Sequence, residues 1–135
     1  MASGLYNSFK GELMAGVHDL TAASSVYVAL MTTAHSFAAA NATWADVAAN
    51  EVSGGGYTAS GSALASQTIT TGAASLFDAA DVAWASSTVK AGHAVLYNVL
   101  TGGNLVGSID FGGEQETNSG TFTIQWHSSG VATLT

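Results

Sequence analysis

The first apolar pattern along the chain has the spacing of an α-helix. Apolar side chains recur at every fourth position, at Leu5, Phe9, Leu13 and Val17. This spacing places them on one face of a helix, and Ser3 is suited to be its N-cap. Because Gly11 and Gly16 lower helix propensity, the helix must gain most of its stability by docking this face. Residues 1–20 therefore predict an N-terminal helix and turn, which docks either on the chain's own core or on a neighbouring subunit.

A shorter period, typical of β-strands, governs the chain from Tyr57 onward. It is clearest in Thr121–Trp126, where Phe122, Ile124 and Trp126 alternate with polar residues. Other segments rich in apolar and β-branched residues are expected to form further strands. These segments are Ser25–Thr32, Gln67–Thr71, Ala74–Asp78, Asp81–Ala85, Gly92–Leu100, Leu105–Phe111 and Val131–Leu134.

Turn-forming residues separate the expected strands. A Gly-Gly pair at the centre of Thr101–Asn104 predicts a tight hairpin. The segment Gly112–Gly120 carries glycines and acidic residues and is expected to be a surface loop. A turn at Ser128–Gly130 would close a last hairpin spanning Thr121–Thr135.

Short strands punctuated by turns predict a mainly β protein. We expect an antiparallel β-sandwich or jelly-roll-like domain with a short N-terminal α-helix, and a compact barrel is the alternative. The length of 135 residues fits a single domain covering residues 1–135, of which residues 57–135 supply most of the strands.

A long, weakly patterned excursion separates the strand at Ser25–Thr32 from the later ones. It covers residues 33–56, and within it Thr43 and Asp46 have the spacing of a capping box, which predicts a short helix around Trp44–Ala49. Connections of this length in a small domain are usually functional or mobile. We therefore expect contacts with partner subunits in the excursion and on the N-terminal helix. The candidate contact residues are Leu5, Phe9, Leu13, His35, Phe37 and Trp44.

Charge excludes several classes of partner. Charged residues make up 8% of the chain, against about 25% in an average soluble domain. Lys10 and Lys90 are the only basic residues besides histidine, and the net charge is −7. Direct nucleic-acid binding needs clustered cations and is not expected, nor is binding to an anionic membrane surface. No secretory signal, membrane span or cysteine is visible, so we expect a soluble protein made in a cytoplasm.

The strand edges are chemically unguarded. Monomeric β-proteins protect free edges with Lys, Pro or inward-pointing charges. This chain has no proline, and Thr121–Thr135 contains no Asp, Glu, Lys or Arg. Bulges or a covering helix could protect the edges within a monomer. Permanent packing against copies of the chain or other subunits is the alternative that we favour.

The chain offers little catalytic or ligand-binding chemistry. Its four histidines are not in any metal-ligand spacing, and no nucleophile elbow or phosphate-binding loop occurs. Asp78 and Asp81 flank Ala79–Ala80 and fit the ordinary role of Asp in turns. We therefore expect neither an enzyme nor a cofactor or metal site. Trp44 is the one candidate for a sugar-stacking platform.

Several segments together carry a resemblance to a known group of proteins. They are MASGLYNSFKGELMAGVHDL at Met1–Leu20, NEVSGGGYTASG at Asn50–Gly61, FDAADVAWASS at Phe77–Ser87, IDFGG at Ile109–Gly113 and GTFTIQW at Gly120–Trp126. With these, the chain resembles small virion structural proteins of tailed bacteriophages. It is most similar to the capsid cement, or decoration, proteins of short-tailed phages, including cyanophages.

The resemblance implies a position and partners. It implies a jelly-roll-like sandwich bound to the outer surface of the capsid, in contact with the major capsid protein and with copies of itself. Such a protein stabilises the shell against internal DNA pressure. Two alternatives stay open from the sequence: a phage tail or fibre component, which shares this β-rich and charge-poor composition, and a host-glycan-binding β-sandwich module.

Overall fold

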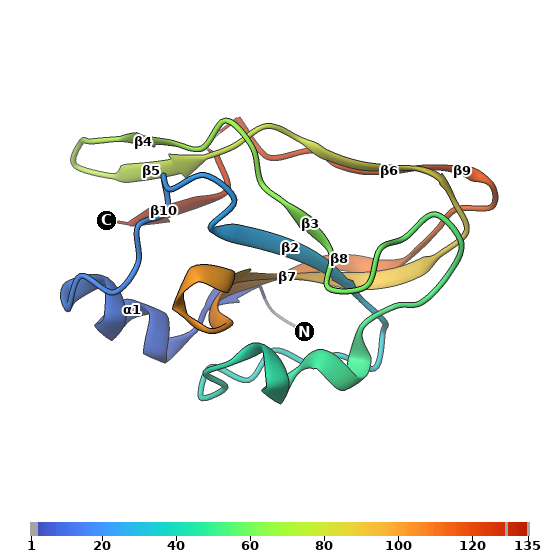
Figure 1. The fold of residues 1–135 in the computed structure, drawn as a ribbon, viewed down its shortest axis with the longest axis horizontal. Helices are drawn as coiled ribbons and strands as arrows, with labels where there is room; N and C mark the ends of the chain where they lie inside the picture. Colours follow the sequence, from blue (N-terminus) through green and yellow to red (C-terminus); the bar gives the residue numbers. More distant parts are fainter. Residues whose placement is uncertain (1–2, 129, 135) are drawn as a thin grey trace.

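A five-stranded antiparallel sheet runs through the middle of the molecule (Figure 1). The computed structural model describes residues 3–128 and 130–134. In the central sheet the strand order is β1-β8-β7-β2-β3. The strands are β1 (Gly4–Leu5), β2 (Val26–Met31), β3 (Ser62–Ala63), β7 (Lys90–Asn98) and β8 (Asn104–Glu116).

A second layer of strands covers one face of this sheet (Figure 1). It consists of a three-stranded sheet in the order β10-β5-β4 and a separate pair, β6-β9. These strands are β4 (Thr68–Thr70), β5 (Ser75–Asp78), β6 (Val82–Ser87), β9 (Gly120–Ile124) and β10 (Ala132–Leu134). All pairings are antiparallel, so the expected mainly β, sandwich-like fold is confirmed.

Helical segments lie below the central sheet in Figure 1. They are α1 (Asn7–Met14) and the short 3-10 helices η1 (Trp44–Asp46), η2 (Ala48–Asn50) and η3 (Val99–Thr101). Helix α1 lies at the end of the sheet, where it also faces β5 and β10. Strand β7 therefore lies between two layers, and its residues 91–98 are all buried. This position explains why the segment is apolar on both sides of the strand.

The N-terminal helix is shorter than its apolar spacing predicts. Gly4 and Leu5 extend along β8 as strand β1, so the helix begins only at Asn7. Ser3 is not its N-cap, because the Ser3 hydroxyl instead accepts a hydrogen bond from the backbone amide of Asp110. Gly16, with φ of +74°, directs the chain away after the helix, which leaves Val17 exposed.

The excursion of residues 33–56 is docked on the central sheet. The capping box of Thr43 and Asp46 forms as predicted, and η1 and η2 follow it. Backbone hydrogen bonds tie the segment to β8 and its turn, from Leu105 to the carbonyl of Ala42 and from Trp44 to that of Gly103. The excursion therefore covers its own sheet.

The C-terminal third of the chain pairs differently from the sequence-based expectation. Gly112–Gly120 is not a free loop, because β8 continues to Glu116 with a bulge opposite Ala91–His93. Strand β10 does not return along β9 but pairs with β5. The predicted turn at Ser128–Gly130 includes residue 129, which lies outside the described residues.

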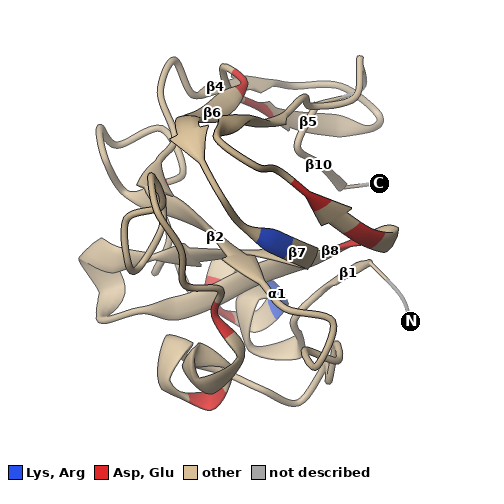
Figure 2. Ribbon diagram, turned by 90° about the vertical axis from the view of Figure 1, so that its right-hand side faces the viewer, with Lys and Arg blue, Asp and Glu red and all other residues tan. Residues whose placement is uncertain are grey.

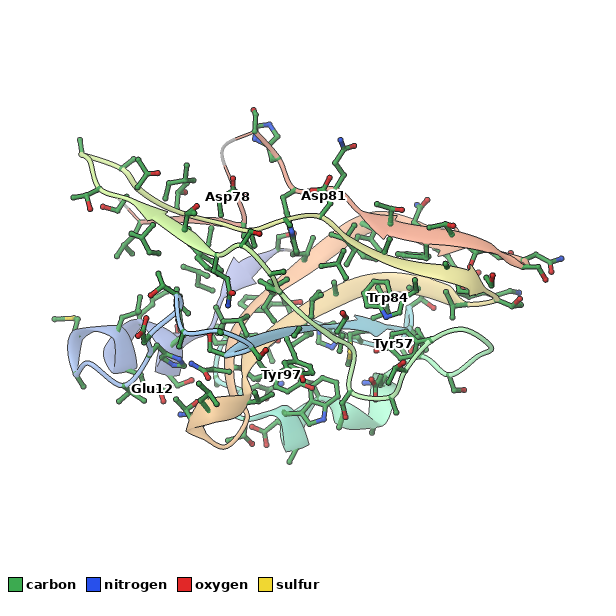
Figure 3. The ribbon with its side chains drawn as sticks, turned by 45° about the horizontal axis from the view of Figure 1, so that its top comes forward. Glu12, Tyr57, Asp78, Asp81, Trp84 and Tyr97 are labelled. Atoms are coloured by element: carbon green, nitrogen blue, oxygen red, sulfur yellow. The ribbon has the colours of Figure 1, made fainter. Side chains whose placement is uncertain are left out.

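Charged residues are few and scattered along the ribbon (Figure 2). Lys90 at the start of β7 is the cross-strand partner of Glu116 at the end of β8. Asp78 and Asp81 flank the connection from β5 to β6 (Figure 3). Asp78 accepts a hydrogen bond from the amide of Ala79, in agreement with the turn role expected for this pair.

Candidate functional site

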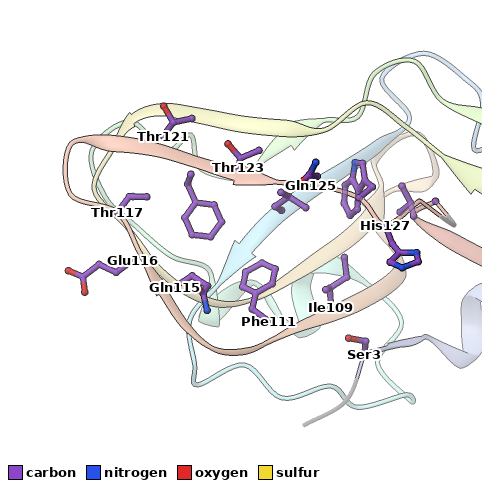
Figure 4. A pocket seen from close by; sticks show the side chains of 15 residues that line it. Ser3, Ile109, Phe111, Gln115, Glu116, Thr117, Thr121, Thr123, Gln125 and His127 are labelled. Atoms are coloured by element: carbon purple, nitrogen blue, oxygen red, sulfur yellow. The ribbon is translucent and has the colours of Figure 1, made fainter.

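An open cleft of about 770 Å³ lies between β8 and β9 (Figure 4). Its apolar residues come from both strands, Ile109 and Phe111 from β8, Phe122 and Ile124 from β9. The rings of Phe111 and Phe122 lie 6.1 Å apart between centroids. The cleft therefore opens onto the apolar interior between the two layers of the sandwich.

The cleft exists because two strand edges are left without partners along it. Strand β9 pairs with β6 on one side only. Strand β8 pairs with β7 along its length, but on its other side only Gly107 and Ser108 pair with β1. Among the described residues, no strand fills the space between Ile109–Glu116 and β9.

Contacts at the two ends of β9 show which of its backbone groups face outward. The carbonyl of Gly120 accepts a hydrogen bond from Ser87 of β6, and the amide of Trp126 donates to Asp81, next to β6. Because successive residues of a strand point their backbone groups to opposite sides, Phe122 and Ile124 also face β6. The backbone groups of the three intervening residues therefore face the open edge, and these residues are Thr121, Thr123 and Gln125.

The cleft is close to electrically neutral. Of the residues that line it, Glu116 is the only carboxylate and His127 the only base. They lie at opposite ends of the cleft (Figure 4). The exposed side chains of Thr121, Thr123 and Gln125 form a polar but uncharged rim. This surface can accept an extended backbone without bringing like charges together.

The predicted contact residues of the N-terminal segment lie elsewhere. Leu5, Phe9 and Leu13 line a small apolar cavity of about 150 Å³ between α1 and the β5-β10 pair. Phe9 is 2% exposed, so the helical stripe is largely covered by the chain's own core. Exposed Ile69 and Leu134 also line this cavity. A partner contact by Leu5 or Leu13 stays a prediction.

The predicted contact residues of the excursion are also largely enclosed. His35 is 1% exposed. The ring of Phe37 packs on Tyr6, with centroids 5.0 Å apart, and Trp44 stacks on Tyr97 at 4.5 Å. The structure therefore does not bring the six predicted residues together in one surface. Phe37 and Trp44 keep part of their surface exposed, and their contact with a partner stays a prediction.

A buried polar cluster lies beneath the excursion. His35 Nε2 is 3.0 Å from the hydroxyl of Ser108, and the rings of His35 and His93 meet edge to face at 5.1 Å. His93 Nε2 is 3.7 Å from Asp110. Burial, and secondly the proximity of His93, lower the pKa of His35 below its usual value. Ser108 and His35 are both buried, with 2% and 1% of their surfaces exposed.

The described part of the chain carries neither a metal-binding cluster nor a membrane-spanning helix. In residues 3–128 and 130–134, no group of three or more His, Asp or Glu side chains is arranged to hold a metal ion. Within the same part of the chain, no helix is long and apolar enough to cross a membrane.

Comparisons with known proteins add no guide to the site. The chain matches no protein-family model, no curated protein and no solved structure. Its function must therefore be argued from the cleft and from the chain's own chemistry.

Sequence reasoning found one side of the cleft and missed the other. The uncharged alternation in Thr121–Trp126 indicated an unguarded edge, and β9 supplies it. The contribution of Gln115 and Glu116 was missed because Gly112–Gly120 reads as a loop. The pairing of Ala91 with Gln115 and of Lys90 with Glu116 places that segment in a strand.

Proposed function

We propose that this protein is a capsid cement, or decoration, protein of a tailed bacteriophage. In this role it binds the outside of the major capsid shell and stabilises the shell against internal DNA pressure. The observation that carries the proposal is the charge-poor cleft between the open edges of β8 and β9. A free edge of this kind is a template for pairing with another subunit.

The charge of the chain supports a position on the outer capsid surface. A net charge of −7 with two lysines and no arginine disfavours contact with packaged DNA. A protein on the outer face of the shell does not contact the packaged DNA and needs no basic residues for that purpose. A surface poor in Lys, Asp and Glu also resembles the cores of protein interfaces, which are depleted in these residues.

Repetition supplies the strength that single contacts lack. The cleft and the small apolar cavity between α1 and the β5-β10 pair are modest surfaces. On a symmetric shell the same weak contact recurs many times, and the effective concentration of neighbouring subunits raises the overall avidity. This fits a cement function better than a function that depends on one tight site.

The decisive experiment measures shell stability directly. Purified protein is added to expanded capsids that lack it, and the temperature of DNA release is followed with a fluorescent dye. We expect the release temperature to rise with protein concentration and then to saturate, because a ligand of the assembled state stabilises that state. An unchanged release temperature at saturating protein would remove the cement function.

Copy number separates cement from the competing functions. Quantitative mass spectrometry of purified virions is expected to give a ratio to the major capsid protein of the order of one. A few dozen copies or fewer per particle would instead assign the protein to the tail or fibre. Absence from virions together with binding on a glycan array would favour the glycan-binding module, with Trp44 as the residue to test first.

A further inference from the structure

We propose that the open edge of β9 pairs with β9 of a second copy, antiparallel and about a two-fold axis at Thr123. This inference rests on the proposed structural function and names the partner of the cleft. The resulting dimer would join the β6-β9 pairs of both copies into one continuous four-stranded sheet. Such isologous pairing uses the same surface on both copies and closes without leaving a further free edge at β9.

The backbone of β9 is oriented for this pairing. Thr121, Thr123 and Gln125 direct their amide and carbonyl groups to the open edge, as the contacts of Gly120 and Trp126 with the β6 side establish. In an antiparallel pair, directly opposed residues of this kind exchange two hydrogen bonds. With the axis at Thr123, that residue meets the partner's Thr123, and Thr121 meets the partner's Gln125. Every outward backbone group between Thr121 and Gln125 then has a partner.

The side chains fit the same arrangement. On the exposed face, Thr123 lies beside the partner's Thr123, and cross-strand Thr–Thr pairs are favourable in sheets. On the inner face, the partner's Phe122 and Ile124 follow the row formed by Phe122 and Ile124 of the first copy. They point toward the cleft, whose other wall carries Ile109 and Phe111 of β8. The pairing therefore covers apolar surface as well as backbone.

Charge favours a second copy as the occupant. The cleft has Glu116 at one end and His127 at the other. A two-fold axis between them reverses the direction of the partner strand and brings the partner's His127 toward Glu116, and the reverse pair forms at the opposite end. Although each copy carries a net charge of −7, strand β9 itself carries none, so the pairing brings no like charges together along the edge. A neutral His127 ring can still hydrogen-bond the partner's Glu116 carboxylate.

The free edges of the three-stranded sheet are poorer candidates than β9. Strands β4 and β10 border that sheet and contain three residues each. They offer fewer opposed pairs than β9, which has five residues and a cleft beside it. Of these three edges, β9 therefore offers the longest stretch for pairing with a second copy.

Solution mass and an edge-blocking variant test the proposal. Light scattering coupled to gel filtration is expected to give twice the monomer mass of 13.5 kDa. Thr123→Pro removes an outward amide for which the described residues provide no acceptor, so the variant is expected to fold and run as a monomer. Thr123→Val keeps the backbone groups and is the matched control, expected to remain a dimer. Circular dichroism and thermal melting establish that each variant is folded.

An introduced cysteine reports the register of the β9 pairing, because the chain has no cysteine of its own. Opposed residues of a hydrogen-bonded antiparallel pair have Cα atoms about 5.5 Å apart, within the span that a disulfide bridges. Thr123→Cys is expected to give a covalent dimer on mild oxidation. Thr70→Cys, exposed on the edge of β4, is the control and is expected to stay monomeric on denaturing gels.

The outcomes separate this proposal from the cement function. A wild-type monomer at high concentration, or an undiminished dimer in a folded Thr123→Pro protein, would overturn β9 pairing. If Thr123→Pro fails to fold, Thr123→Lys is tested instead and is expected to be monomeric, because two lysines would face each other across the axis. Equal cross-linking of Thr70→Cys and Thr123→Cys would count against β9 pairing. Capsid stabilisation by a protein that is monomeric in solution would retain the cement function while rejecting the dimer.

Discussion

The backbone amide of Trp126 donates a hydrogen bond of 3.0 Å to the carboxylate of Asp81, although the two residues are 45 positions apart. The indole nitrogen of Trp126 also donates to the carbonyl of the neighbouring Ala80, at 2.9 Å. Asp81 precedes β6, and Trp126 follows β9. This pair of contacts fixes the end of β9 against β6 and so decides which side of β9 remains open.

Loss of the Asp81 carboxylate should loosen that end of the sandwich. Asp81→Ala leaves the Trp126 amide without its acceptor, and we expect a loss of about 1 kcal/mol in the free energy of unfolding, the size of one net hydrogen bond. Asp81→Asn keeps an acceptor oxygen and should lose less. Urea titration followed by tryptophan fluorescence measures both variants, and equal losses would argue against a specific role for this contact.

The apolar face of α1 should contribute strongly to stability. Phe9 is enclosed between α1 and the β5-β10 pair, and Phe9→Ala is expected to cost about 3–5 kcal/mol, as for other buried aromatic truncations. Met14, on the same helix, is 92% exposed, so Met14→Ala is the matched control and should change stability by less than about 0.5 kcal/mol. Thermal and urea unfolding provide the comparison, and a small effect of Phe9→Ala would contradict the docking of this helix.

Two glycine positions should respond in opposite directions to alanine. Gly61 has φ of +86°, and a Cβ there would lie 2.0 Å from the carbonyl oxygen of Val28. Gly61→Ala should therefore destabilise the fold by more than about 1 kcal/mol. A Cβ at Gly11 in α1 meets nothing within 4 Å, and Gly11→Ala should stabilise by about 0.5–1 kcal/mol. Melting temperatures in opposite directions from wild type are the expected result.

Stability should fall on mild acidification. Burial, with His93 nearby, lowers the pKa of His35 in the folded protein, and burial lowers that of His18 despite the opposing effect of Glu12. The unfolded chain, with histidine pKa values of about 6.5, then binds more protons than the folded one. Stability is therefore full above about pH 6.5 and declines as the pH falls through that value toward the lower folded pKa.

Urea midpoints between pH 7.5 and pH 5.5 test this pH dependence. We expect the midpoint to fall with pH in the wild type and to fall less in His35→Gln, which cannot take up the proton. Met14→Ala removes an exposed side chain that carries no titratable group, so it is the control and should keep the wild-type slope. A wild-type midpoint that rises on acidification would contradict the sign of both shifts.

Local patterns predicted most of the elements. Three local patterns each predicted the correct kind of structure. They are the alternation in Thr121–Trp126, the run at Gly92–Leu100 that is apolar on both sides of the strand, and the capping box at Thr43. These features depend on residues close together in the chain, where backbone preference and side-chain period act directly. The helix was predicted too long because its spacing continues past Gly16 and because pairing of Gly4–Leu5 with β8 is a long-range event.

The sequence by itself determined a mainly β, antiparallel fold, a charge-poor surface and strands without guarding charges. Tertiary structure alone decided that β10 pairs with β5, that β8 extends to Glu116, and that the β9 edge opens onto a cleft. The physical reason is that a strand's period fixes which side chains are buried, whereas its choice of neighbour depends on competition among many distant strands with nearly equal patterns.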